Sequence, residues 1–197
     1  MKVVTRKTLW EGHYLRSVLV EYIDERDHDP AQRADQKVRN WETIERIGCS
    51  GVVVIVPFTD DGAIILIRQY RPPVDGYVIE LPAGLIDIGE TPETSARREL
   101  IEETGYAARD MDFLISGPAS SGSSSEILDV FVASGLSFVG IGKRDEAENM
   151  ETIRVPMEVL DSEISRLEQE GNYVDLKVHG MIRLAKDFLR KKSARDL

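Results

Sequence analysis

The chain has 197 residues, 42% of them hydrophobic, which is enough to fill the core of one ordinary domain with a small annex. Its 35 acidic and 25 basic residues give a net charge of −10, which argues against a broad interface with the phosphates of DNA or RNA. The longest apolar run, residues 52–58, is too short to cross a bilayer, so we expect no membrane insertion. The composition favours a globular protein that binds any phosphate locally.

The cellular setting is predicted from cysteine content and from the start of the chain. The only cysteine, Cys49, excludes an intrachain disulfide framework. Residues 1–17 lack the apolar core of a secretory signal. We therefore expect a reducing, cytoplasmic environment.

The first segment is predicted to form two or three antiparallel strands. Residues 15–23 and 37–47 are β-prone and alternate in polarity, and the polar insert between them, residues 24–36, is typical of a hairpin loop. Two apolar runs follow, residues 52–58 and 63–70, and both are apolar enough to be central strands. The Asp-Gly pair between these runs, at residues 61–62, predicts that they form a hairpin.

The middle of the chain is predicted to be less regular. Residues 71–84 indicate an irregular loop with one short strand, and residues 125–136 indicate another strand. Residues 120–125, SSGSSS, are typical of a flexible loop, and residues 141–156 indicate a charged loop that leads into one more strand.

The tail is predicted to carry two amphipathic helices. In residues 156–171 and 174–192, apolar side chains recur at helical spacing, and Gly171 is a plausible stop for the first helix. The expected core positions are Val159, Ile164 and Leu167 in the first helix and Leu176, Met181, Leu184, Ala185 and Phe188 in the second.

A further helix is predicted over residues 92–104. Thr91 is a good N-cap, Pro92 suits the first turn, and Gly105 suits the left-handed position after the last turn. This helix places three carboxylates on one face, because its glutamates stand at i, i+3 and i+4: Glu99, Glu102 and Glu103. Repulsion between exposed like charges costs only a few tenths of a kcal/mol, roughly, so this pattern alone is also compatible with a solvated acidic face.

Two neighbouring features favour a metal site. Arg98 stands four residues before Glu102 and can orient it by an ion pair, which leaves Glu99 and Glu103 to ligate a hard divalent cation such as Mg²⁺. The helix also follows a tight turn at residues 82–84, which allows the backbone to approach whatever the carboxylates bind.

The same stretch resembles a known family signature. Gly84, Glu90 and residues 98–106, RELIEETGY, fill every fixed position of the Nudix box, G-x5-E-x7-R-E-U-x-E-E-x-G-U, where U is a bulky apolar residue. Residues 67–93 resemble the segment leading into the box in ADP-ribose and ADP-sugar pyrophosphatases, and the resemblance extends over roughly residues 10–188.

The resemblance implies an α/β Nudix fold, in which a mixed β-sheet is sandwiched between α-helices and preceded by an N-terminal antiparallel sheet. Such enzymes are typically homodimers that exchange this N-terminal sheet. We accordingly divide the chain into residues 1–48, an N-terminal sheet and dimerisation segment, and residues 49–197, the hydrolase domain.

The resemblance also implies the activity and the metal site. Nudix enzymes hydrolyse a diphosphate linked to another moiety and use divalent cations, here Mg²⁺ with Mn²⁺ as a second option. The implied ligands are Glu99, Glu103 and the carbonyl of Ala83, with Glu102 beside them and Arg98 holding it. Glu90 is expected to brace the loop before the helix.

Substrate contacts are implied outside the box. Arg71 of the QYRPP element would contact substrate phosphates, although a surface salt bridge is its simpler role. Trp41 would stack on the base, with Glu42 and Arg46 as nearby polar contacts, and Tyr14 would stack from the other subunit. Ordinary packing is the alternative for both aromatic residues.

The general base is expected in the loop before the last strand, where Glu148 fits best, Glu151 second and Glu146 less well. One departure from the family pattern concerns the distal sugar pocket. Ser121 stands where ADP-ribose pyrophosphatases tend to carry a proline, although Gly122 is retained, and this substitution weakens the case for strict ADP-ribose specificity.

The sequence thus predicts a Mg²⁺-dependent nucleoside diphosphate sugar pyrophosphatase that converts ADP-ribose to AMP and ribose 5-phosphate. GDP-mannose or an ADP-hexose is the alternative substrate. Other classes also remain open: a Nudix module that binds ADP-ribose without cleaving it, and an acidic scaffold whose helix binds no metal.

Overall fold

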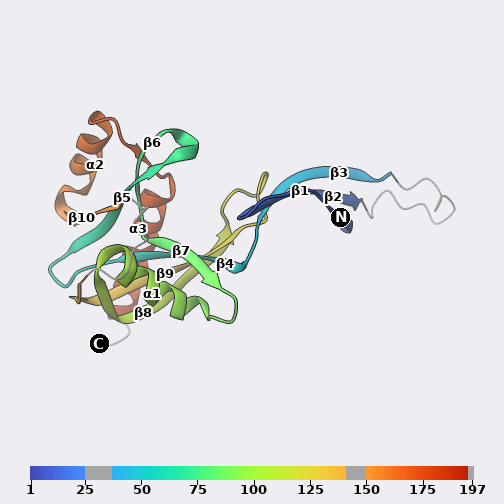
Figure 1. Cartoon of the computed structure of the whole chain (residues 1–197). Helices are drawn as coiled ribbons and strands as arrows, with labels where there is room; N and C mark the ends of the chain where they lie inside the picture. The colour runs from blue at the N-terminus through green and yellow to red at the C-terminus, as the bar shows by residue number, and fades with distance from the viewer. Residues whose placement is uncertain (25–36, 141–149, 195–197) are drawn as a thin grey trace. The chain divides into compact units, whose positions relative to one another are not determined.

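The computed structural model describes residues 1–24, 37–140 and 150–194. The chain divides into two compact units (Figure 1). The first comprises Met1–Ser50 together with Gly117–Ile127, and the second comprises Gly51–Ser116 together with Leu128–Leu197. In the described parts of the chain, no helix is long and apolar enough to cross a bilayer.

The first unit is built on a three-stranded antiparallel sheet, as predicted. Its strands lie in the order β1 (Lys2–Glu11), β2 (Leu15–Ile23) and β3 (Arg39–Arg46). Residues 120–125, predicted to be a flexible loop, are attached to this sheet, because the N–H of Ile44 donates to the carbonyl of Ser123 at 2.9 Å. The predicted hairpin loop at residues 24–36 lies outside the described residues apart from Asp24.

The second unit contains two four-stranded mixed sheets and three α-helices. One sheet has the order β7 (Ala83–Asp87), β4 (Cys49–Pro57), β9 (Ile127–Phe138), β8 (Tyr106–Pro118), and the other has the order β10 (Met150–Pro156), β5 (Ala63–Arg71), β6 (Gly76–Glu80), β11 (Tyr173–Val174). Each sheet includes a parallel pair, β4 with β9 in the first and β6 with β11 in the second. The predicted fold class is confirmed, and the expected mixed sheet is present as two sheets.

The turn between β4 and β5 forms as predicted, but the two strands do not make a hairpin. Gly62 has a positive φ of 80° and its N–H donates to the carbonyl of Thr59 at 3.0 Å. Beyond the isolated bridge between Phe58 and Ile64, the strands belong to different sheets. The hairpin prediction is wrong because both strands are buried on both faces, so tertiary packing and not the turn decides their neighbours.

Helix α1 (Pro92–Thr104) has the predicted bounds and both predicted caps. The hydroxyl of Thr91 accepts a hydrogen bond from the N–H of Thr94 at 3.2 Å, and Gly105 ends the helix with a φ of 78°. The helix packs against β7 and covers one face of its sheet (Figure 1). Leu100 and Ala96 of the helix are buried there against Val53 and Ile55 of β4. The caps visible in the sequence were sufficient to define this element.

Helices α2 (Leu160–Gln169) and α3 (Lys177–Ser193) belong to the larger core. They share it with residues of β5 and with the face of β4 that points away from α1. The short 3₁₀ turns η3 (Pro72–Val74) and η4 (Met157–Val159) precede β6 and α2. Of the predicted core positions, those that are buried or partly buried are Ile164, Leu167, Met181, Ala185 and Phe188.

Three predicted core positions in these helices are wrong. Val159 lies in η4 and is exposed, whereas the next residue, Leu160, is buried. Leu176 precedes α3 and is 93% exposed, and Leu184 is also exposed. The buried residues of α3 are Val178, Ile182 and Ala185, of which only Ala185 was among the predicted core positions. The sequence contains apolar residues on neighbouring faces of these helices, so periodicity alone did not separate the buried positions from the exposed ones.

Three strands are absent from the sequence prediction. The longest, β8, begins directly after the end of α1, and Met111 is its only buried residue. Strand β7 occupies the segment that was predicted to be a turn at Ala83 and Gly84, and β11 has only two residues. These strands carry few buried apolar residues, so their sequences lack the alternation that predicts a strand.

Candidate active site

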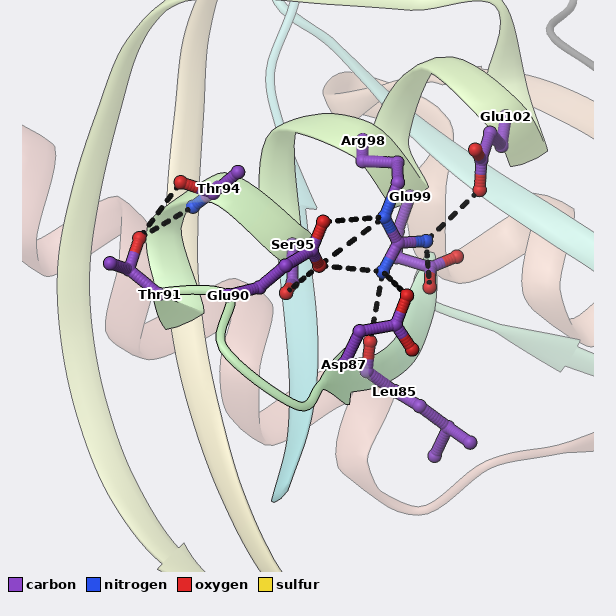
Figure 2. A network of polar contacts seen from close by, with 9 residues as sticks. All are labelled: Leu85, Asp87, Glu90, Thr91, Thr94, Ser95, Arg98, Glu99 and Glu102. Atoms are coloured by element: carbon purple, nitrogen blue, oxygen red, sulfur yellow. Dashed lines mark hydrogen bonds and ion pairs between the residues drawn. The ribbon is translucent and has the colours of Figure 1, made fainter. Parts of the chain in front are cut away.

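The guanidinium of Arg98 is the centre of a polar network on α1 (Figure 2). Its Nη1 donates to Oε1 of Glu99 at 2.8 Å and to Oε2 of Glu102 at 3.1 Å. Its Nη2 donates to Oε2 of Glu90 at 3.0 Å and to the carbonyl of Leu85 at 3.1 Å. The sequence predicted contact with Glu102, and the structure adds Glu99 and Glu90. One cation therefore relieves the repulsion among three carboxylates.

This network shifts the pKa values of Arg98 and Glu90. The hydrogen bond that Arg98 donates to Glu90 raises the pKa of Arg98 above its ordinary range, and the contacts with Glu99 and Glu102 act in the same direction. Hydrogen bonds from Arg98 and then from the hydroxyl of Ser95, at 2.6 Å, lower the pKa of Glu90. Glu90 thus joins the loop before α1 to the helix, as expected for a bracing residue.

The carboxylates of Glu103 and Glu99 lie close to the backbone at the start of β7. Glu103 is only 8% exposed, and its Oε2 accepts a hydrogen bond from the N–H of Ala83 at 2.9 Å. A methyl group added to Gly84 would lie 1.9 Å from the carboxyl carbon of Glu99. Only glycine allows the carboxylate of Glu99 to lie this close to the backbone, which explains the glycine at the start of the box.

The donor chemistry at this place fits a hard divalent cation. Among the described residues, no group of three or more His, Cys, Asp and Glu side chains forms a ready-made metal cluster. Mg²⁺ does not require one, because proteins usually hold it with one or two carboxylates while waters and substrate phosphates complete the shell. Glu99 and Glu103, which both approach the segment Ala83–Gly84, supply such a pair.

Arg71 lies at the end of β5 and forms a two-pronged ion pair with Glu80 of β6. Its Nε donates to Oε1 of Glu80 at 2.7 Å, and its Nη2 donates to Oε2 at 2.6 Å. The salt bridge considered as the simpler role of Arg71 therefore exists. Its partner is a buried carboxylate, so the pair orients the guanidinium.

In the first unit, Trp41 is held at its polar edge. Its Nε1 donates to the carbonyl of Gly122 at 2.9 Å, and the side chain is 50% exposed. Arg46, on the same strand, forms an ion pair with Glu126, and Glu42 is exposed. A cavity of about 450 Å³ lies beside Trp41, and its lining includes Lys2, Arg6, Tyr22, Thr43 and Ser121.

Tyr14 precedes β2 and is 71% exposed. Its ring meets His13 edge-on, with the ring centroids 4.4 Å apart. Much of the ring surface thus faces solvent in the single chain, which leaves it accessible to another molecule.

The candidate bases lie before and within β10. Glu148 and Glu146 are outside the described residues. Glu151 lies on β10, 3.6 Å from Nη1 of Arg68. The next residue, Thr152, donates from its hydroxyl to the carbonyl of Glu103 at 3.3 Å. Because neighbouring strand residues point to opposite faces, Glu151 lies on the face of β10 away from Glu103.

Two residues near the box were not predicted from sequence. Glu80 had a usable signal, since it is the only charged residue in the apolar run 77–82. Thr152 had none, because its contact with Glu103 depends on how β10 packs against α1.

Comparison with known proteins agrees with this architecture. The model of the NUDIX domain matches residues 50–174. The chain is 32% identical to an ADP-ribose pyrophosphatase of Bacillus subtilis over 80% of this chain and 82% of that protein. It is 30% identical to an ADP-sugar pyrophosphatase of Mus musculus over 90% of this chain and 84% of that protein.

Two further matches differ in what they cover. A methanol dehydrogenase activator of Bacillus methanolicus is 39% identical over 52% of this chain, and the match spans 57% of that protein. A crystal structure of an ADP compounds hydrolase superposes with a TM-score of 0.73 at 24% identity, covering 97% of this chain and 95% of that one, and therefore supports the fold. With the box, the fold and the domain match in agreement, the chain belongs to the Nudix family of hydrolases.

Proposed function

We propose that this protein hydrolyses the pyrophosphate bond of a nucleoside diphosphate sugar, with ADP-ribose as the favoured substrate and AMP and ribose 5-phosphate as products. The observation that carries the proposal is the approach of Glu99 and Glu103 to the segment Ala83–Gly84. Relatives named ADP-ribose pyrophosphatase and ADP-sugar pyrophosphatase, aligned over most of this chain, support the substrate class.

In the proposed site, Glu99, Glu103 and the carbonyl of Ala83 hold Mg²⁺, with Mn²⁺ as a possible replacement. When bound, such a cation neutralises pyrophosphate oxygens and lowers the pKa of water. Glu102 lies beside this pair, and Arg98 keeps Glu102 and Glu99 in place through its hydrogen bonds. The protein therefore presents its carboxylates in a fixed arrangement before any ligand arrives.

Arg71 contacts a substrate phosphate in this proposal. Its guanidinium is always charged, and the pair with Glu80 orients it while part of the side chain stays exposed. The base stacks on Trp41, and Glu42, Arg46 and Gly122 provide polar contacts around it. The hydrogen bond between Trp41 and Gly122 supports this role because it holds the indole ring while half of the side chain is exposed.

The general base is Glu148, with Glu151 as the second candidate. The contacts of Glu151 favour Glu148, since Glu151 lies beside Arg68 on the face of β10 away from Glu103. We expect Glu148→Gln to lower kcat at least about a hundredfold, while Glu151→Gln serves as the matched comparison and changes kcat about threefold or less. Steady-state kinetics measures kcat of both variants. A larger loss of kcat in Glu151→Gln would identify Glu151 as the general base.

We further propose a cytoplasmic homodimer in which residues 1–48 exchange between subunits and residues 49–197 form the hydrolase domain. All residues of β1 are exposed in the single chain, including Val3, Leu9 and Trp10, and a partner that covers them would remove this apolar surface from water. Tyr14 would then stack on the base from the partner subunit. Light scattering coupled to size-exclusion chromatography measures the subunit number directly.

The decisive experiment is a substrate panel of ADP-ribose, an ADP-hexose and GDP-mannose, with Mg²⁺ or Mn²⁺ and products identified by mass. We expect the highest kcat/KM for ADP-ribose, with AMP and ribose 5-phosphate released. A higher kcat/KM for GDP-mannose would favour the alternative that Ser121 raises. Tight binding of ADP-ribose without any product would instead favour a binding module.

A further inference from the structure

Gln69 contains a buried hydrogen-bond acceptor that has no donor in the part of the chain that the structure describes. The residue is only 8% exposed, and its Oε1 is fully buried with no hydrogen-bond partner among the described residues. Folded proteins leave few buried polar atoms in this state, because each one has lost its contact with water and gained nothing in return. Such an atom in a hydrolase requires an explanation.

The strand register places Gln69 beside the proposed site. It lies on β5, opposite Met150 of β10 and Val78 of β6. The neighbouring position on the same face of β5 is Ile67, and opposite Ile67 stands Thr152, which donates to the carbonyl of Glu103. Gln69 is thus one step along the sheet from the place where β10 contacts the box helix.

The ion pair between Arg71 and Glu80 crosses the part of the sheet where Gln69 lies. Arg71 stands opposite Gly76, and Glu80 stands opposite Ile67, so the pairing of Gln69 with Val78 falls between them. Directly opposed residues in an antiparallel sheet point to the same face, and therefore the pair reaches across the face on which Gln69 lies. Gln69 is bordered on one side by the contact to Glu103 and on the other by the arginine proposed to hold phosphate.

The chemistry of the atom restricts what binds there. An amide oxygen only accepts hydrogen bonds, and neither carboxylates nor the oxygens of an ionised pyrophosphate carry a proton to donate. The amino group of the base is a donor too, but the proposal places the base on Trp41, so the other donors of the bound ligands are O–H groups. These belong either to waters that accompany the cation or to hydroxyls of the sugar.

We propose that Gln69 is a positioning residue whose Oε1 accepts a hydrogen bond from an O–H group of the bound ligands, either a cation-associated water or a sugar hydroxyl. This inference rests on the proposed function and deepens it. It explains why a polar atom remains buried and unpaired in the ligand-free chain: its donor arrives with the ligands.

The test uses Gln69→Met, which preserves the length of the side chain and removes the acceptor, and Gln69→Leu as a second apolar variant. Gln169→Met, at an exposed position of α2, is the matched control. Three quantities are measured for each protein: the Tm without ligands, the Kd for Mn²⁺ alone, and the Kd for ADP-ribose in EDTA, where hydrolysis cannot deplete the ligand.

We expect the Tm of Gln69→Met to equal or exceed that of the wild type, because an unpaired acceptor is replaced by an apolar group. At the same time one of the two affinities weakens by about tenfold, the loss of one good hydrogen bond. Weaker Mn²⁺ binding identifies a water as the donor, and weaker ADP-ribose binding in EDTA identifies a sugar hydroxyl.

The opposite pattern overturns the proposal. If both Gln69 variants lower the Tm while both affinities stay at the wild-type value, the amide serves the fold, for example through a permanently bound water. Failure of the proposed function is seen separately, as absence of nucleotide-sugar hydrolysis by the wild-type protein in the substrate panel.

Discussion

Helices α1 and α3 are stabilised in different ways. Helix α1 has a side-chain N-cap and a glycine C-cap, and the residues it buries include Ser95, Glu103 and Thr104. Helix α3 has no side-chain cap hydrogen bond at Leu176 and buries Val178, Ile182 and Ala185. The difference teaches that α1 adds directional polar contacts to the burial of Ala96 and Leu100, whereas α3 is placed mainly by apolar burial. Substitutions in the two helices should therefore damage different properties.

The largest effect is expected from the carboxylates of α1. Glu99→Gln and Glu103→Gln should each lower kcat by roughly a thousandfold or more, because they remove proposed metal ligands. Both variants should stay folded, since glutamine retains an oxygen that can accept the hydrogen bonds of the glutamate. Glu168→Gln, on the exposed surface of α2, is the control for the substitution itself. Wild-type turnover by Glu99→Gln would show that the metal assignment is wrong.

Gly84→Ala should have the next largest effect. The added methyl group would lie 1.9 Å from the carboxyl carbon of Glu99, so the carboxylate must move. Displacing a catalytic group by this order of distance lowers kcat/KM by about a hundredfold.

The matched control for this variant is a glycine in helix α3. Apart from the adjoining residues and backbone of its own helix, no atom of the described residues lies within 4 Å of a methyl group added at Gly180 of α3. Gly180→Ala should therefore leave kcat/KM unchanged and raise the free energy of unfolding by about 0.5–1 kcal/mol, the usual gain of alanine over glycine inside a helix. Equal kinetics of the two alanine variants would contradict the role given to Gly84.

Substitutions on α3 should alter stability and spare catalysis. Ile182→Ala removes a fully packed side chain and should lower the free energy of unfolding by about 2–4 kcal/mol. Leu184→Ala removes an exposed side chain and should cost roughly 0.5 kcal/mol or less. Urea unfolding measures both, and kcat of the folded proteins should match the wild type. A larger loss of unfolding free energy for Leu184→Ala than for Ile182→Ala would show that Leu184, as predicted from sequence, faces the core.

The smallest effect concerns the pH dependence of stability. Because the pKa of Glu90 is lowered in the folded state from its ordinary value of 4.5, its contribution is fully present above pH 4.5 and is lost as the pH falls through the folded-state pKa. The stability difference between the wild type and Glu90→Gln should therefore be constant near neutral pH and shrink below pH 4.5. Denaturant unfolding at several pH values measures it, and a difference independent of pH would exclude this coupling.

The same contrast explains which parts of the fold could be predicted. The bounds of α1 follow from Thr91, Pro92 and Gly105, since a cap acts on residues that are adjacent in sequence. The full set of buried residues in α3 and the partners of β4 and β5 could not be found in this way. Apolar residues on several faces allow several packings, and the choice among them depends on distant elements.

In the candidate site, too, the residues that are close in sequence could be predicted, whereas the contacts between separate elements could not. The spacing of Glu99, Glu102 and Glu103 was visible at once, and so was the proximity of Arg98, because all four lie within two turns of one helix. The contact of Glu103 with Ala83 and the ion pair of Arg71 with Glu80 join separate elements, so they depend on how those elements pack and pair. Sequence spacing carries no information about such contacts.

The sequence by itself determined the family, the box helix with its caps, and the cluster of carboxylates, because these depend on residues close together along the chain. Only the tertiary structure decided that β4 and β5 separate into two sheets, that α3 turns Ile182 inward, and that Gln69 is buried with no donor among the described residues. Packing and strand register involve residues far apart in sequence, and their outcome is set by which surfaces exclude water together.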